Sequence, residues 1–358
     1  MIRKIKSFIT EKNIFQTGQI SFFIGVFFIG SALPISIICF LISSLITLLK
    51  KKDLFFKDIW NYPFMICAVL MIISAFYNFL GNNFIGIEGI QTSTIWIDTL
   101  NWIPLFFLFW SFQPYIKSQE QKIIFAKVII AGSIPILISC ALQLWFGIYG
   151  PFQTFYDLII WFQKPMNDSS SVSGLFSNPN YLASWLVIIS PFSLYLSIKQ
   201  KNYPKKLITL LILFLNIYFL SQANSRNAIL GTFSSIIIIF GIKKSIIIII
   251  SLIAISIAIF SFSNLLFSNN DFIRNILPLD LIYKSTNLQD LPRFEVWQKG
   301  LTFIKERPIF GWGAGTFYLL FLSRGGSWNS QHTHNMPLDM AYKYGIFVSI
   351  ILTLTITL

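Results

Sequence analysis

The chain has 358 residues, of which 55% are hydrophobic and 11% are charged, with a mean hydropathy of +0.69. Soluble domains carry about 25% charged residues, so this composition excludes a soluble protein and indicates an integral membrane protein. The formal net charge of +13 would suit a nucleic-acid-binding protein. The basic residues, however, form short clusters between apolar runs, which is typical of membrane topology and argues against nucleic acid as a partner.

The apolar runs predict an all-α integral membrane protein, a polytopic bundle of about 10 transmembrane helices, because one span takes about 20 residues. The first run, residues 20–49, is too long for one ordinary span and has Gly30 and Pro34 in its middle. Proline breaks helices and glycine permits a tight turn, so this run predicts two short helices. Helices are predicted at residues 18–32, 35–49, 62–80, 95–112, 123–146, 181–198, 207–221, 227–242 and 245–262, with a tenth from 336.

These helices divide the chain into three parts. Residues 1–262 hold helices one to nine, residues 263–335 form one long loop, and residues 336–358 form the tenth helix. Pro104 is expected to kink the fourth helix, and the aromatic stretch 155–162 is expected to lie in the membrane interface. The basic N-terminus is followed by an apolar run without a small-residue cleavage site, so the first helix is predicted to stay uncleaved.

The basic clusters predict which side of the membrane each loop faces. They lie at the N-terminus and in residues 50–57, 117–127, 199–206 and 243–244, which all fall on one side of the predicted bundle. Cytoplasmic loops carry the excess of lysine and arginine. The N-terminus is therefore predicted to be cytoplasmic, and the long loop extracytoplasmic.

The three cysteines, Cys39, Cys67 and Cys140, each lie inside an apolar run. A free cysteine in such a place packs as a small apolar side chain. The sequence therefore predicts no disulfide and no thiol chemistry.

Arg226 lies between two apolar runs on the predicted outer side. A charge near the membrane edge is costly unless it has a partner or a role. A guanidinium suits a phosphate group through two hydrogen bonds, which favours an anion site. The alternative is an arginine that extends its charge to the membrane surface.

Arg293 follows Pro292 at the start of a second helical pattern, in which Phe294, Trp297, Leu301 and Ile304 recur at helical spacing. Free backbone N–H groups at a helix N-terminus attract phosphate, as a guanidinium does. Arg293 is therefore a second phosphate candidate, and the alternative is a solvated surface charge.

The segment Gly-Trp-Gly-Ala-Gly at 311–315 lacks the spacing and the βαβ context of a nucleotide-binding loop, so it predicts a tight turn. The only two histidines, His332 and His334, follow it. A zinc site has weak support because no cysteine or nearby carboxylate accompanies them in sequence. A general base is the better match for a histidine that is neutral near pH 7.

Two residues after the histidines have predicted structural partners. Asn335 precedes an apolar run and can cap the helix that begins there, which would fix His334 at the membrane face. Asp339 is one turn into that helix and can pair with Lys343 four residues later.

Four blocks of the sequence resemble the O-antigen ligase/polymerase family in residue content and in order. The resemblance implies a metal-independent, inverting transfer of a glycan from an undecaprenyl-diphosphate carrier, without a cofactor, in the bacterial inner (plasma) membrane. The acceptor would be lipid A core or a growing glycan, and membrane lipids the other partners. The blocks are residues 174–183, Ser225-Arg226, residues 293–315, and His334-Asn335 with Gly345 downstream.

The resemblance also implies a role for each candidate residue. Arg226 and Arg293 would hold the diphosphate, and His334 would activate the acceptor hydroxyl. Asn180, from the first block, and Asn335 would contribute to substrate binding.

Three alternatives stay open at this point. Ligases and polymerases share these motifs and differ in acceptor. Some relatives are linked to solute uptake, which predicts ionisable residues in mid-span, and Asp98 and Lys343 are the candidates. The family often has an acidic residue shortly before the glycine matched by Gly345, where this chain has Lys343, so a catalytically degenerate relative is the third.

Overall fold

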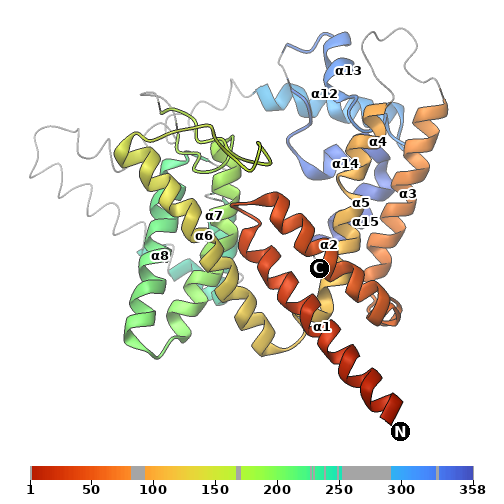
Figure 1. Cartoon of the computed structure of the whole chain (residues 1–358). Helices are drawn as coiled ribbons and strands as arrows, with labels where there is room; N and C mark the ends of the chain where they lie inside the picture. The colour runs from red at the N-terminus through yellow and green to blue at the C-terminus, as the bar shows by residue number, and fades with distance from the viewer. Residues whose placement is uncertain are drawn as a thin grey trace, which may run out of the picture. The chain divides into compact units, whose positions relative to one another are not determined.

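The computed structural model describes residues 2–81, 93–166, 171–225, 228, 230–237, 239–247, 250–251, 292–327 and 330–357. They fall into two compact units (Figure 1). Unit 1 comprises Met1–Glu11, Ser44–Pro114 and Asn287–Leu358, and unit 2 comprises Lys12–Ser43 and Tyr115–Thr286.

The regular secondary structure of the described residues is helical apart from one two-stranded hairpin, which confirms a helical membrane protein. Six of its helices are long and apolar enough to cross a membrane. A helix pair bent by 107°, Leu230–Ile237 and Ile239–Ile247, could add a seventh. The predicted count of about ten and the full loop 263–335 stay predictions, because residues 252–291 lie outside the described part. The six are Leu33–Lys57, Asn61–Leu80, Ser93–Tyr115, Gln119–Phe146, Pro179–Lys199 and Tyr203–Gln222.

The first two helices start and end at different residues from those predicted. Helix α1 runs over Ile2–Phe28 and α2 over Leu33–Lys51. The break between them falls where Pro34 was expected to end the first helix. The predicted start of α1 was wrong because it was placed at the first apolar residues, whereas lysine, arginine, glutamate and glutamine are also good helix formers.

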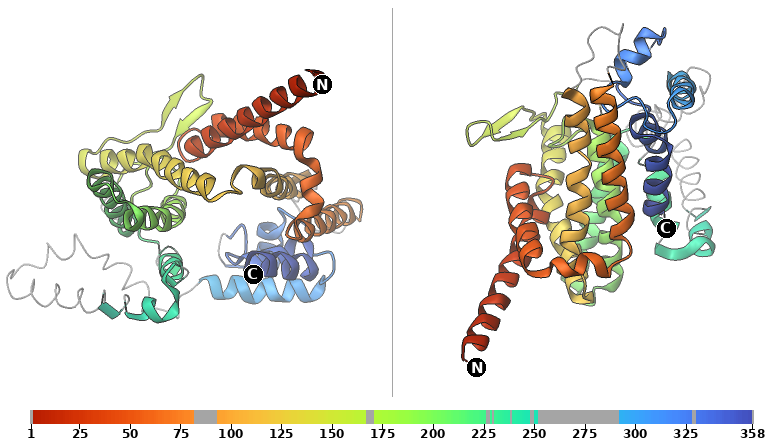
Figure 2. Two further views of the ribbon diagram at one scale, coloured as in Figure 1. Left: turned by 90° about the horizontal axis from the view of Figure 1, so that it is seen from below. Right: turned by 90° about the vertical axis from the view of Figure 1, so that its right-hand side faces the viewer.

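Unit 2 contains α6 (Gln119–Phe146), α7 (Pro179–Lys199) and α8 (Tyr203–Gln222). A capping box begins α6, since the Ser118 hydroxyl accepts from the N–H of Gln121 and the Gln121 side chain accepts from the N–H of Ser118. The aromatic stretch contributes to an antiparallel hairpin of β1 (Phe152–Thr154) and β2 (Ile159–Trp161), which extends from the helices in Figure 2.

Unit 1 contains the glycine-rich segment 311–315 and the two histidines. Two predicted helices of this unit are broken. The fourth splits at Asn101-Trp102, because Pro104, in the first turn of the next helix, has no N–H to continue the previous one. The tenth splits at Gly345, whose φ is +96°. The helices are α3 (Asn61–Leu80), α4 (Ser93–Leu100), α5 (Ile103–Phe112), α12 (Pro292–Glu306), α13 (Phe317–Ser323), α14 (Met336–Tyr344) and α15 (Ile346–Thr357).

The core of unit 1 joins helices that are far apart in sequence. Phe303 of α12, Phe317 of α13 and Tyr342 of α14 form one aromatic cluster with ring centroids 4.9–6.1 Å apart. Such pairs stabilise a fold by about 0.5–1.5 kcal/mol each beyond their buried area. Figure 2 shows α12 lying alongside the C-terminal helices, consistent with its packing on α14.

The buried face of α12 includes only Ile304 of the four apolar residues whose spacing predicted this helix. Val296, Phe303 and Ile304 are buried, whereas Phe294 and Leu301 are 67% and 49% exposed. The prediction counted apolar residues at helical spacing, and two faces of this helix satisfy that spacing.

Candidate active site

The glycine-rich segment forms a tight turn against the end of α14. The N–H of Trp312 donates to the carbonyl of Tyr342 (2.7 Å), and the N–H of Gly313 donates to that of Lys343 (3.1 Å). Gly311 has a φ of +63°, and a Cβ there would lie 2.4 Å from the Tyr342 oxygen. The predicted tight turn is confirmed, and glycine is required because no side chain fits.

Helix α3 holds the same turn from its other side. The Ser74 hydroxyl and the Asn78 amide both donate to the carbonyl of Phe310, at 2.6 and 3.2 Å. The ring of Tyr77 stacks on the ring of Phe310 with centroids 4.5 Å apart. These contacts lie in the C-terminal half of α3, and they satisfy buried polar groups that would otherwise cost free energy.

Helix α12 brings Arg293 to residues 331–335, which are called the histidine segment below. Trp297 lies one turn after Arg293 on the same face of the helix, and its indole N–H donates to the carbonyl of Thr333 (2.9 Å). The Thr333 methyl group also approaches Gly300, where a Cβ would lie 3.3 Å from it. The residue between the two histidines is therefore fixed to α12, the helix whose first turn contains Arg293.

The histidine segment has a fixed local conformation. The rings of His332 and His334 have centroids 4.2 Å apart. His334 has a φ of +53°, a left-handed conformation that costs a residue with a side chain about 1–3 kcal/mol. The Asn335 side chain accepts from the N–H of Leu338 (3.2 Å), so the predicted cap of α14 is confirmed.

The surroundings of His334 favour its neutral form. Partial burial lowers the pKa of His334 below its ordinary value of 6.5, and the charges of His332 and Arg293 lower it further, while Asp339 opposes them. Desolvation and nearby positive charge both disfavour the imidazolium. A neutral imidazole at pH 7 can accept a proton, which is the state that a general base needs.

A cavity of about 570 Å³ lies beside the histidine segment, on the side of His332. His334 and Arg293 are not among its lining residues. Its wall includes acidic, basic, amide and aromatic side chains, which come from α4, the turn between α4 and α5, α13, α14 and the histidine segment. The lining residues are Asp98, Trp102, Gly315, Tyr318, Leu319, Gln331, His332, Asp339 and Lys343.

Three of these side chains form an ion-pair triad. The Lys343 Nζ lies 2.8 Å from Oδ2 of Asp339 and 2.8 Å from Oδ2 of Asp98. The pair with Asp339 confirms the predicted i, i+4 contact, whereas the partner on α4 was missed. Its only signal in the sequence was a lone carboxylate in an apolar run, and Trp102 and Tyr318 carry no signal at all.

The other two candidate residues lie elsewhere. Asn180 is in unit 2, in the first turn of α7, where it is exposed and its backbone N–H donates to Oδ1 of Asn178 (2.8 Å). Arg226 lies outside the described residues. The described structure thus brings together Arg293, His334 and Asn335.

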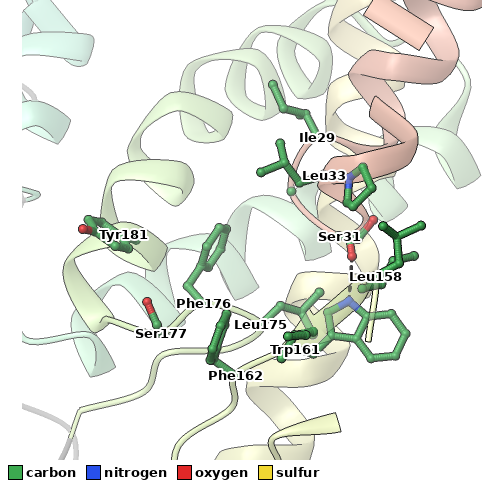
Figure 3. Close-up of a pocket in the computed structure, with 14 residues that line it drawn as sticks. Ile29, Ser31, Leu33, Leu158, Trp161, Phe162, Leu175, Phe176, Ser177 and Tyr181 are labelled. Atoms are coloured by element: carbon green, nitrogen blue, oxygen red, sulfur yellow. Dashed lines mark hydrogen bonds between the residues drawn. The ribbon is translucent and has the colours of Figure 1, made fainter. Parts of the chain in front are cut away.

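Unit 2 has a cavity of its own, of about 360 Å³, under the hairpin (Figure 3). Its lining is mainly apolar and aromatic, with Phe162, Phe176 and Tyr181 among the residues drawn. The Trp161 indole N–H donates to the carbonyl of Ser31 (2.6 Å), which ties the hairpin to the turn between α1 and α2. Part of the first family block, residues 174–183, therefore lies against an apolar pocket.

The comparison with protein families matches residues 208–353 to the model described as O-antigen ligase. The matched stretch contains Arg226, Arg293 and His334, and it begins after residues 174–183. No curated protein and no solved structure matches the chain.

Proposed function

We propose that this chain, whose residues 208–353 match the O-antigen ligase family model, moves a glycan from undecaprenyl diphosphate to an acceptor hydroxyl. The acceptor is lipid A core in the ligase version and a growing glycan in the polymerase version. The apolar helices and the family together indicate a bacterial membrane enzyme that takes a lipid-linked donor.

The observation that carries this proposal is the attachment of the histidine segment to α12. The bond from Trp297 to Thr333 holds the histidine segment on α12, and Arg293 in the first turn of this helix is close enough to lower the pKa of His334. A glycosyl transfer from a diphosphate needs both groups at one point, a base for the incoming hydroxyl and a cation for the leaving group.

In the proposed reaction, the imidazole of His334 accepts the proton of the acceptor hydroxyl. The hydroxyl oxygen forms a bond to the anomeric carbon as the bond from that carbon to the diphosphate oxygen breaks. Attack from the face opposite the diphosphate inverts the anomeric centre. The diphosphate leaves with the electron pair, and the guanidinium of Arg293, joined by Arg226, stabilises its negative charge.

The two asparagines have different places in the proposal. The Oδ1 of Asn335 is bonded to the N–H of Leu338, which gives this residue a positioning role for His334. Asn180 is exposed at the start of α7, and we assign it to substrate binding with the first family block.

The proposed side of the membrane follows from α3. The glycine turn contacts the C-terminal half of α3, whereas the lysine-containing 3₁₀ helix Lys52–Lys57 lies just before its N-terminus (Figure 1). A cytoplasmic lysine cluster then puts the candidate site at the extracytoplasmic end. An impermeant thiol reagent should label Gln298→Cys but not Asp53→Cys in intact spheroplasts, and the reverse pattern would end this assignment.

Deletion of the gene tests the proposed function. We expect surface polysaccharide on gels to lose its attachment while lipid-linked polymer accumulates, if the protein is a ligase. We expect a cap of a single repeat unit if it is a polymerase. An unchanged polysaccharide profile would contradict both versions.

A further inference from the structure

The cavity lined by Asp98, Trp102, Tyr318, His332, Asp339 and Lys343 is separate from the arginine that would hold the donor. We propose that this cavity is the subsite for the acceptor saccharide, and that it recognises neutral sugar hydroxyls. The inference rests on the proposed function, because it assigns the second substrate of the same reaction.

The location of the cavity suits an acceptor. His332 lines it, and the ring of His332 lies 4.2 Å from the ring of His334, measured between centroids. A sugar in the cavity would lie next to the candidate base, while Arg293 lies outside the cavity wall. The two substrates would therefore approach His334 from different directions.

The charge of the ion-pair triad disfavours a phosphate group. Two carboxylates, Asp98 and Asp339, face one ammonium, Lys343, and both pairs measure 2.8 Å. The ammonium is already neutralised, so the triad carries a net negative charge that repels a diphosphate. Carboxylates are strong hydrogen-bond acceptors, and sugar hydroxyls are donors.

The triad also holds its carboxylates in place. Lys343 and Asp339 have side chains that are 10% and 12% exposed, whereas the side chain of Asp98 is 25% exposed. Asp98 is thus the carboxylate most open to a ligand, and its bond to Lys343 keeps its orientation fixed. Fixed acceptors lose less entropy when they bind a ligand.

The other residues that line the cavity, and its volume, suit a saccharide. Trp102 packs on the core cluster of α3, α14 and α15 and also lines the cavity, so it offers an apolar ring beside the polar groups. Gln331 adds an amide that both donates and accepts. The volume of about 570 Å³ lies within the range of roughly 300–1,000 Å³ that is usual for small-ligand sites.

Direct binding tests the proposal without any transfer step. The probe is the desalted oligosaccharide that mild acid releases from the host's own surface polysaccharide. It is titrated into the full chain in lipid nanodiscs and followed by saturation-transfer NMR. We expect saturable binding by the wild type and at least tenfold weaker binding by Leu319→Trp, which fills the cavity and leaves the triad in place.

Three further variants separate recognition from folding. Asp98→Asn keeps the pair between Lys343 and Asp339 and should weaken binding about fivefold or more. Leu319→Met is the matched control for volume and should bind as the wild type does. Asp53→Asn removes an exposed carboxylate outside the cavity and should also leave binding unchanged.

The outcomes distinguish this inference from the proposed function. No binding by the wild type, or equal binding by the wild type and Leu319→Trp, would overturn the subsite even if gene deletion shows loss of glycan transfer. Pyrophosphate binding that is lost in Leu319→Trp would also overturn it and assign the cavity to the donor. Saccharide binding lost in Leu319→Trp, with unchanged polysaccharide in the deletion strain, would establish a saccharide site in the cavity but reject the transferase function and with it the acceptor role.

Discussion

Trp297 of α12 donates its indole N–H to the backbone carbonyl of Thr333, 2.9 Å away, although 36 positions separate the two residues. Thr333 is the residue between the two histidines. The bond therefore fixes the backbone next to His334 to α12, the helix whose first turn contains Arg293.

The first prediction removes this bond. Trp297→Phe keeps an aromatic ring but loses the indole N–H. The hydrogen bond that this removes contributes about 0.5–1.5 kcal/mol. We expect the transfer rate to fall about tenfold while the thermal unfolding temperature changes little. Trp161→Phe is the matched control, because it removes the bond to Ser31 in unit 2 and should leave transfer near the wild-type rate. Equal transfer by both variants would show that the bond to Thr333 does not position the site.

The second prediction concerns the shape of the cation at the start of α12. Arg293→Lys keeps the charge but loses the planar fork that binds two phosphate oxygens. Charge-assisted hydrogen bonds contribute about 1.5–3 kcal/mol, so transfer should fall about 10- to 100-fold. The control Arg324→Lys changes an exposed arginine that pairs with Glu306 at 3.4 Å and should have no effect. Wild-type transfer by Arg293→Lys would exclude a forked diphosphate contact.

The third prediction compares two glycines with positive φ. A Cβ at Gly345 would lie 1.8 Å from the carbonyl oxygen of Ile309, whereas a Cβ at Gly147 meets nothing within 4 Å. Gly147→Ala should therefore lower the free energy of unfolding by only about 1–2 kcal/mol, which is the cost of the left-handed conformation for a residue with a Cβ. Gly345→Ala should lower the free energy of unfolding by more than this and abolish transfer, because the added Cβ would push α14 away from the turn at Pro308. Similar thermal shifts for the two variants would show that the turn at Gly345 is loosely packed.

The sequence predicted those parts of the site that depend on near neighbours. The cap by Asn335 and the pair between Asp339 and Lys343 each join residues three or four positions apart, so spacing alone was enough. The glycines of 311–315 likewise predicted their own turn. The local sequence pattern also predicted most of the helices, although it placed the start of α1 too late.

The contacts between distant segments could not be predicted in this way. Asp98 reaches Lys343 only because α4 and α14 lie together in unit 1, and nothing in either segment encodes that contact. The bond between Trp297 and Thr333 depends in the same way on how α12 packs on α14. The cavity wall combines segments that are far apart in the sequence, so the local pattern of any one of them could not reveal it.

The fourth prediction is a pH dependence. The pKa of His334 is held below 6.5 by burial, His332 and Arg293, and only the neutral imidazole can accept a proton. The transfer rate should therefore be level at pH 7 and fall as the pH drops through a midpoint below 6.5. His332→Gln removes an electrostatic neighbour that lowers the pKa of His334, so the midpoint of this variant should move up. A wild-type midpoint above 6.5, or no shift in His332→Gln, would contradict this account of His334.

The central claim is that His334 is the base that activates the acceptor hydroxyl. Its most direct test is the single-turnover transfer rate of purified His334→Ala in nanodiscs, with saturating lipid-linked donor and acceptor. General-base catalysis is worth about 10²–10⁴-fold in rate, so we expect a loss of that size with donor binding retained. We expect the same loss in His334→Gln, which keeps a polar side chain but cannot accept the proton as imidazole does. A rate within about threefold of the wild type in either variant would contradict the claim.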